Sequence, residues 1–325
     1  MRPDKQPKRE SLGGVMPLRV HFCLVIWALL ALCPPVSAQD APRAVVYVAG
    51  SEKNSALTSH MMNLLADALG DDAEIRRFQP GQTARSDGSV IITLGPEAFT
   101  QVRQESRTVP ILALLVDKPF IAGYAERSAG DIGAVLYNSP LIRQAMAGKV
   151  ILPHATRVAM LATPETAELY EELTPRLPEL GMEGRVFIVS DNDDLIPALV
   201  RALEYGDFLL AATDSTIYNP RTIKHILLTT YRRSRIVIGP SQAYVKAGSL
   251  ASTYVPLRTT AESAARQIAM FQQTGRFPPP TYPDEFQLEI NDQVARSLNI
   301  PLPSREELRA SIESRLSNPQ EGAHE

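Results

Sequence analysis

The chain has 325 residues, of which 44% are hydrophobic and 6% aromatic, and its formal net charge is −3 at pH 7. This length exceeds what one small core needs and accommodates two lobes of ordinary domain size. A mildly acidic chain is poorly suited to nucleic acid, whose phosphates attract basic surfaces, so we expect no nucleic-acid partner.

Residues 1–38 have the pattern of a secretory signal peptide. Five basic residues precede an apolar run from about Val20 to Leu32, and Val36-Ser37-Ala38 supplies the small residues that signal peptidase requires. The run is short for a bilayer span, so a retained membrane anchor is the disfavoured alternative. We therefore expect a periplasmic protein, translated from either Met1 or Met16.

Both cysteines, Cys23 and Cys33, lie within this segment. A mature chain without them would have no disulfide and no thiol chemistry. A lipoprotein anchored at Cys33 is the disfavoured alternative, because Leu32 stands where such sites have a small residue. Loss of residues 1–38 leaves 28 of the 33 basic and 34 of the 36 acidic residues, a formal charge near −6.

Short apolar runs rich in Val, Ile and Leu recur after residue 43 and predict β-strands. They lie at Ala44–Ala49, Val90–Leu94, Pro110–Val116, Ile132–Leu136, Arg157–Leu161, Arg185–Val189, Phe208–Ala212 and Ile236–Ile238, and two more strands are expected within Ser249–Tyr254 and after Phe286. Helical patterns separate most of these runs. The order predicts an alternating β/α chain with parallel sheets that are covered on both faces.

Several predicted helices begin at a proline in the first helical position. These starts are Gly95-Pro96-Glu97, Ser139-Pro140, Thr163-Pro164-Glu165 and Asn219-Pro220. Thr259 and Glu262 have capping-box spacing at another start, and Lys118–Ala129 has a less regular helical pattern. Because each start follows a strand closely, helix amino ends should line the carboxyl edges of the sheets, where open α/β folds bind ligands.

Catalytic and cofactor motifs are incomplete in this chain. The loop Gly50–Ser55 lacks both the Gly-Lys-Ser/Thr core and the G-x-G-x-x-G spacing, so we predict no nucleotide cofactor. Gly239–Ala243 resembles the nucleophile elbow of serine hydrolases, but Pro240 precedes Ser241 and the only later histidine is His324. We therefore predict no catalytic residue and no enzyme.

Metal ligands are also not grouped along the chain. His60, His154 and His225 are isolated, and no H-E-x-x-H motif occurs, so no metal site is predicted. The acidic run Asp191–Asp194 is explained as a cap of the following helix without a bound cation.

Polar residues after the predicted strands are the candidates for ligand binding. Acceptors such as Asp117 and Asp214 could bind an ammonium group, and hydroxyls at helix amino ends could bind a carboxylate, although such residues also form plain caps and turns. Three tyrosines are candidates for stacking on a ligand. The expected set is Ser51, Glu52, Gly95, Glu97, Asp117, Tyr137, Asn138, Thr163, Glu165, Asp214, Ser215, Tyr218, Ser241 and Tyr254.

From about Ala44 to Pro303 the chain resembles the periplasmic substrate-binding proteins of ABC importers, several of which bind aromatic amino acids. The residues that carry the resemblance are Ala212–Ser215, Ile236–Ser241, Val245–Ser252, the helix from Thr259, Ile290-Asn291 and Ala295–Pro301. Glu126–Gly133 departs from the turn that the family usually has there. The resemblance implies the type I periplasmic binding protein fold: two Rossmann-like lobes with parallel sheets, joined by a multi-crossover hinge.

Domain boundaries and function follow as expectations from this resemblance. The first lobe would comprise residues 44–136 and 256–283, the second 137–255 and 284–303, and residues 304–325 a partly disordered tail. The function would be that of a monomeric solute-binding component, with a small ligand such as an amino acid or related carboxylate in the interlobe cleft and an ABC permease of the inner membrane as partner. The alternatives are a periplasmic accessory or sensor protein without a transport role, and an exported hydrolase, which lacks a coherent set of catalytic groups.

Overall fold

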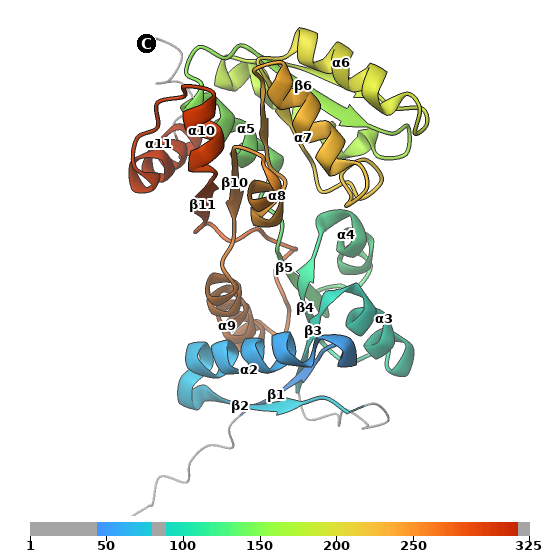
Figure 1. Ribbon diagram of the computed structural model, residues 1–325. Helices are drawn as coiled ribbons and strands as arrows, with labels where there is room; N and C mark the ends of the chain where they lie inside the picture. The colour runs from blue at the N-terminus through green and yellow to red at the C-terminus, as the bar shows by residue number, and fades with distance from the viewer. Residues whose placement is uncertain (1–43, 80–88, 318–325) are drawn as a thin grey trace, which may run out of the picture. The chain divides into compact units, whose positions relative to one another are not determined.

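Two β-sheets with helices on both faces make up the described part of the chain (Figure 1). The computed structural model describes residues 44–79 and 89–317. The expected signal peptide, Cys23, Cys33 and His324 lie outside the described residues, as does the part of the expected tail after Ser317. Among the described helices, none has the length and apolar character needed to cross a membrane.

The first sheet is entirely parallel, with the strand order β2-β1-β3-β4-β5. Its strands are β1 (Ala44–Ala49), β2 (Ala73–Arg77), β3 (Val90–Leu94), β4 (Ile111–Val116) and β5 (Ile132–Leu136). All residues of β3 and β5 are buried, as expected for strands covered on both faces. The sequence prediction missed β2, a strand with exposed Glu74, Arg76 and Arg77 at the sheet edge.

Helices from distant parts of the sequence cover the first sheet (Figure 1). They are η1 (Glu52–Asn54), α2 (Ser55–Leu69), η2 (Gly70–Asp72), α3 (Gly95–Glu105), α4 (Lys118–Glu126) and α9 (Leu257–Thr274). Helices α2 and α9 pack on one face, and α3 and α4 pack on the other. Ala261, Ala264 and Ile268 recur at helical spacing along α9 and are fully buried against this sheet.

The second sheet has the order β11-β10-β9-β8-β6-β7. Its strands are β6 (Arg157–Ala162), β7 (Glu183–Ile188), β8 (Phe208–Leu210), β9 (Ile236–Ile238), β10 (Ala251–Tyr254) and β11 (Gln287–Ile290). All neighbours are parallel except β10 and β11, which are antiparallel. The prediction of parallel sheets is therefore correct except at this edge.

Helices also cover both faces of the second sheet. They are α5 (Leu141–Ile151), η3 (Ala167–Tyr170), η4 (Thr174–Leu180), α6 (Leu195–Tyr205), α7 (Ile223–Arg232), α8 (Gln242–Ala247), α10 (Asp292–Ser297) and α11 (Arg305–Ser317). Helices α6 and α7 cover one face, and α5 and α11 the other. Leu308 and Ile312 of α11 are buried in this core, so the described part of the expected tail is an integral helix.

Four predicted helix starts are wrong, among them the one at Asn219-Pro220, because α7 begins only at Ile223 after the N-cap Thr222. Helix α9 begins at Leu257, before the expected capping box at Thr259 and Glu262, and no side chain caps it. Ser139 does not cap α5, because its hydroxyl is hydrogen-bonded to that of Thr253. The chain after Thr163 forms the short 3₁₀ helices η3 and η4 in place of an α-helix. Pro175 and Pro178 explain this difference, because proline lacks the N–H that a helix interior needs.

The chain passes between the two sheets three times, at residues 137–140, 255–256 and 278–286. The third segment first extends the first sheet, where Thr281 forms a parallel bridge with Val135. Arg143 of α5 then holds it: its buried guanidinium donates to the carbonyl oxygen of Pro283 at 3.1 Å and lies 4.5 Å from the centre of the Phe286 ring. These connections form the expected multi-crossover hinge.

Asp207 ties the amino ends of two central strands of the second sheet and makes stability depend on pH. Burial raises the pKa of Asp207, but the N–H groups of Thr156 and Arg157, which donate to Oδ2 at 2.8 and 3.0 Å, outweigh this effect and lower it overall. Because the pKa of Asp207 is lowered in the folded state, its ionised carboxylate stabilises the fold at pH values above the pKa that it has in the unfolded chain. This contribution is lost as the pH falls through the folded-state pKa.

We expect Asp207→Asn to lower the free energy of unfolding by about 1 kcal/mol at pH 7, since the amide still accepts these bonds and the site is partly exposed. The difference from the parent protein should shrink below about pH 4. Denaturant unfolding between pH 7 and pH 3 measures it, with Asp193→Asn, an exposed position, as the control. A difference that does not change with pH would contradict this account of Asp207.

Candidate functional site

The carboxyl ends of the parallel strands define where a ligand site is expected. In each sheet the strand order reverses direction around its first strand, at β1 beside β3 and at β6 beside β8. Open α/β sheets bind ligands in the crevice at such a switch point. Two cavities lie among the loops that follow these strands.

The larger cavity has a volume of 690 Å³ and is lined by loops from both sheets. Asp117 and Lys118 follow β4, Asn138 follows β5, and Thr213 follows β8. The remaining lining residues come from α4, the first crossover and the start of α5, the turns after β6, the loop after β8 and the third crossover. They are Pro119, Ala122, Ser139, Pro140, Leu141, Ile142, Glu168, Leu169, Glu171, Glu172, Leu173, Arg176, Ala212 and Tyr282. The volume is in the range of small-molecule sites.

An ion pair joins the two sides of this cavity. Lys118 at the start of α4 and Glu172 between η3 and η4 approach to 2.6 Å. Their side chains are 45% and 78% exposed, so the pair contributes little to stability. Through this ion pair, α4 of the first sheet contacts the turns after β6 of the second sheet.

Polar groups without a protein partner also line the larger cavity. The side-chain amide of Asn138 makes no hydrogen bond to any described residue, and one carboxylate oxygen of Asp117 accepts only the N–H of Phe120, at 3.0 Å, as a cap of α4. Burial, followed by the charges of Glu172 and Asp117, raises the pKa of Tyr282. The cavity thus combines free polar groups with a negative electrostatic field.

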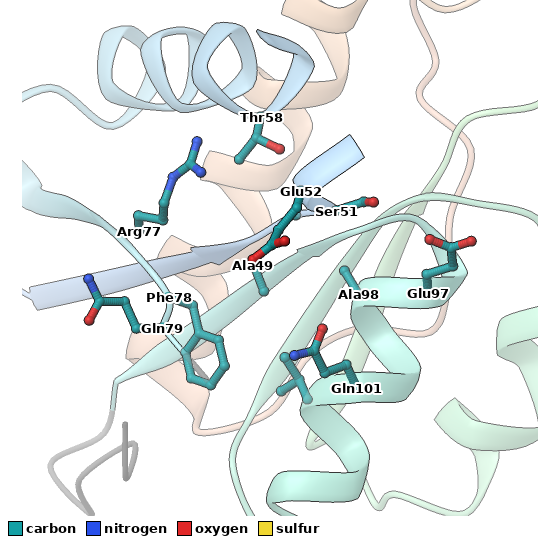
Figure 2. A pocket seen from close by; sticks show the side chains of 12 residues that line it. Ala49, Ser51, Glu52, Thr58, Arg77, Phe78, Gln79, Glu97, Ala98 and Gln101 are labelled. Carbon is teal, nitrogen blue, oxygen red and sulfur yellow. The ribbon is translucent and has the colours of Figure 1, made fainter. Parts of the chain in front are cut away.

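Figure 2 shows the smaller cavity, which has a volume of 390 Å³ and lies at the end of β1. Glu52 of η1 lies near its centre, Arg77 of β2 lies on one side, and Glu97 and Gln101 of α3 lie on the other. The ring of Phe78 supplies an apolar surface. This lining carries both signs of charge.

The expected ligand-binding residues separate between the two cavities. Ser51, Glu52 and Glu97 line the smaller one, and Asp117 and Asn138 line the larger one. The others line neither of these two cavities: Gly95, Tyr137, Thr163, Glu165, Asp214, Ser215, Tyr218, Ser241 and Tyr254.

The structure corrects the roles expected for Tyr218 and Asp214. Tyr218 is only 2% exposed and packs edge-on against Tyr244 in the core, so it presents no face to a ligand. Asp214 is 4% exposed, and its two oxygens accept from the Thr166 hydroxyl at 2.6 Å and the Thr216 N–H at 2.8 Å. Its carboxylate therefore holds the loops together and leaves no free oxygen pair for an ammonium group.

Several lining residues escaped the sequence prediction. Glu168, Glu171 and Glu172 follow the helix start predicted at Thr163-Pro164-Glu165, whereas the 3₁₀ turns bring them to the larger cavity. The prolines at 175 and 178 were the signal that an uninterrupted α-helix could not form there. Tyr282 arrives from the third crossover, whose path has no signature in the local sequence.

Metal-binding geometry does not occur within residues 44–79 and 89–317, where no three His, Cys, Asp or Glu side chains are grouped to hold an ion.

Ser241 stands at the amino end of α8, after the cis peptide bond between Gly239 and Pro240. The linings of the two cavities combine carboxylates, amides and apolar side chains.

No protein-family model matches the chain, and no curated protein matches its sequence. Solved structures match its fold. The ligand-free, open structure of CD0873, a substrate binding protein with adhesive properties from Clostridium difficile, superposes with a TM-score of 0.63 at 14% identity, covering 81% of this chain and 97% of its own.

Two further structures have similar agreement. An ABC domain in complex with L-Trp from Streptococcus pneumonia has a TM-score of 0.55 at 14% identity, covering 81% of this chain and 96% of its own. A conserved domain protein from Vibrio cholerae has a TM-score of 0.54 at 19% identity, covering 82% and 98%. At these identities the likeness establishes the fold. The chain has the type I periplasmic binding protein fold, with two mostly parallel α/β sheets joined by a multi-crossover hinge.

Proposed function

We propose that the protein is a non-enzymatic solute-binding protein that takes a small molecule into the larger cavity. The observation that carries this proposal is a 690 Å³ cavity, lined from both sheets at the carboxyl ends of their strands, whose Asn138 amide has no partner among the described residues. A ligand would satisfy such groups and displace water from the apolar lining. An amino acid is one candidate, since a structure of the same fold is in complex with L-Trp.

The cellular role that we propose is delivery of the ligand to an ABC permease of the inner membrane, after export of a monomeric protein to the periplasm. Fold likeness to a substrate binding protein supports this role, as does the signal-peptide pattern of residues 1–38. An accessory or sensor role would use the same cavity without transport. Uptake of the identified ligand by cells with and without the protein separates the two: transport requires that uptake falls when the protein is absent.

Thermal-shift screening with amino acids, amines and small carboxylates tests ligand binding. A true ligand should raise the melting temperature with the logarithm of its concentration, equivalent to about 2.7 kcal/mol at about 100 times Kd. Asn138→Leu should reduce this shift, because it removes the free amide and occupies part of the cavity. Asn63→Leu, on the exposed surface of α2, is the matched control. A protein whose melting temperature responds to no compound would not be a small-solute binder.

A further inference from the structure

The charges that line the larger cavity are predominantly negative. Four carboxylates, from Asp117, Glu168, Glu171 and Glu172, face two cations, from Lys118 and Arg176. These carboxylates are part of the lining that the loops of both sheets and the crossovers form. They decide which sign of charge a ligand needs in order to bind there.

Each of the two cations already has a carboxylate of the protein beside it. Lys118 pairs with Glu172 at 2.6 Å, and Arg176 approaches Glu179 of η4 at 4.0 Å. Asp117, Glu168 and Glu171 form no ion pair with any described residue. The lining therefore holds three carboxylates whose charge the protein does not neutralise.

Two tyrosines near the site interact with the charge of Asp117. Burial raises the pKa of Tyr282, and the charges of Glu172 and Asp117 raise it further. Burial likewise raises the pKa of Tyr137, next to Asn138, and the charge of Asp117 adds to the shift. A negative field that opposes ionisation of a phenol also opposes binding of an anion.

An apolar surface lies beside the carboxylates. Leu141 and Ile142 at the start of α5, Leu169 and Leu173 of the turns after β6, and the Tyr282 ring all line the cavity. A ligand that matches this lining has an apolar body and a positive end. The side chain of Asp117 already caps the amino end of α4.

We propose that the larger cavity recognises an organic amine cation: an ammonium group placed among Asp117, Glu168 and Glu171, on an apolar body that packs against Leu141, Leu169 and Tyr282. This inference rests on the proposed function and specifies the chemistry of its ligand. It ranks compounds that share one carbon skeleton: the amine binds most tightly, the zwitterionic amino acid less tightly, and the carboxylic acid least.

Calorimetry and thermal shift with matched series test this ranking on the whole protein. The probes are 2-phenylethylamine, phenylalanine and 3-phenylpropionate, together with hexylamine and hexanoate as an aliphatic pair. We expect amine affinity to exceed that of the matching carboxylate by at least about tenfold, since a charge-assisted hydrogen bond contributes about 1.5–3 kcal/mol. Amine binding should also weaken as ionic strength rises.

Charge-removing variants assign the effect to the carboxylates. Asp117→Asn keeps an acceptor for the Phe120 N–H, so it preserves the cap of α4 while removing the charge. This variant and the double variant Glu168→Gln/Glu171→Gln should each weaken amine binding by about threefold to tenfold and leave carboxylate binding unchanged or tighter. Glu183→Gln removes one exposed carboxylate from β7, outside the cavity, and should change neither affinity.

The outcomes distinguish this inference from the proposed function. Tighter binding of carboxylates than of amines would overturn the cation preference while a solute-binding function stands. Equal loss of amine affinity in Glu183→Gln and in Asp117→Asn would reduce the effect to net charge and overturn the assigned site. Absence of binding by every compound in both series, and in the wider screen, would remove the proposed function and this inference with it.

Discussion

Replacing Gln144 with alanine should lower the free energy of unfolding by about 2–4 kcal/mol, because it leaves the buried N–H of Thr253 without a partner and leaves the Thr253 carbonyl with the Ser252 hydroxyl as its one remaining side-chain donor. Gln144 is 1% exposed, and its amide replaces a neighbouring strand for Thr253 of β10. Its Oε1 accepts the Thr253 N–H at 2.9 Å, and its Nε2 donates to the Thr253 carbonyl at 2.9 Å. Strand β9 pairs with β10 only at Ala251 and so does not reach these groups, while β11 pairs along the other edge of β10.

Two further variants separate the effect of the lost hydrogen bonds on the free energy of unfolding from the effect of the lost side-chain volume. Q144M nearly conserves the volume but provides neither hydrogen bond, so it should be destabilised almost as much as Q144A. Q144E keeps an acceptor but places a carboxylate against the Thr253 carbonyl oxygen, so its destabilisation should be larger at pH 7 than at pH 4, where the carboxyl is more readily protonated.

Denaturant unfolding of these variants measures the changes, with Gln273→Ala on the exposed surface of α9 as the control, expected within about 0.5 kcal/mol of the parent protein. Full stability of Q144M would show that water replaces the amide and that the bonds to Thr253 are dispensable. The position also matters for the hinge, since α5 follows the first crossover and Thr253 stands two residues before the second.

The elements that the sequence predicted well are those whose pattern is local. Strands β1, β3, β5 and β9 have the expected bounds, because each is a continuous apolar run; β3, β5 and β9 are wholly buried, and β1 is partly buried. Strand β2 has no such run, and its place at the sheet edge depends on pairing with β1, a contact made far along the chain. The strand expected after Phe286 is present as β11, but its antiparallel direction was not foreseeable, because a strand's direction depends on the route of the crossover before it.

The site was less predictable, for a similar reason. Asp117 and Asn138 directly follow strands, and the common carboxyl edge of a parallel sheet brings such residues to one side. Glu171 and Tyr282 reach the same cavity through 3₁₀ turns and the third crossover, whose paths depend on tertiary packing. Asp214 also follows a strand, yet Thr166, distant in sequence, occupies its carboxylate. A residue's position directly after a strand therefore predicted that it lies near the carboxyl edge of the sheet. It did not predict whether its side chain is free to contact a ligand.

Helix α9 provides the strongest test of how distant segments make one core. Ile268 is 0% exposed and packs in the cluster that includes Leu65 of α2 and Leu112 of β4, although about 150 residues separate it from the latter. Ile268→Ala should lower the free energy of unfolding by about 2–5 kcal/mol through lost transfer energy and the remaining cavity, and Ile268→Val by about 0.5–1.5 kcal/mol.

Met270 supplies a control on the same helix, because its side chain is 47% exposed. Met270→Ala removes an apolar side chain from the same element without emptying a core site, so it should change the free energy of unfolding by less than about 0.5 kcal/mol. Denaturant titration of the three variants measures these changes. If Ile268→Ala lowered the free energy of unfolding no more than Met270→Ala, the packing of α9 on the first sheet would be contradicted. A graded loss from Val to Ala at position 268 would instead show that this late segment completes the first sheet's core.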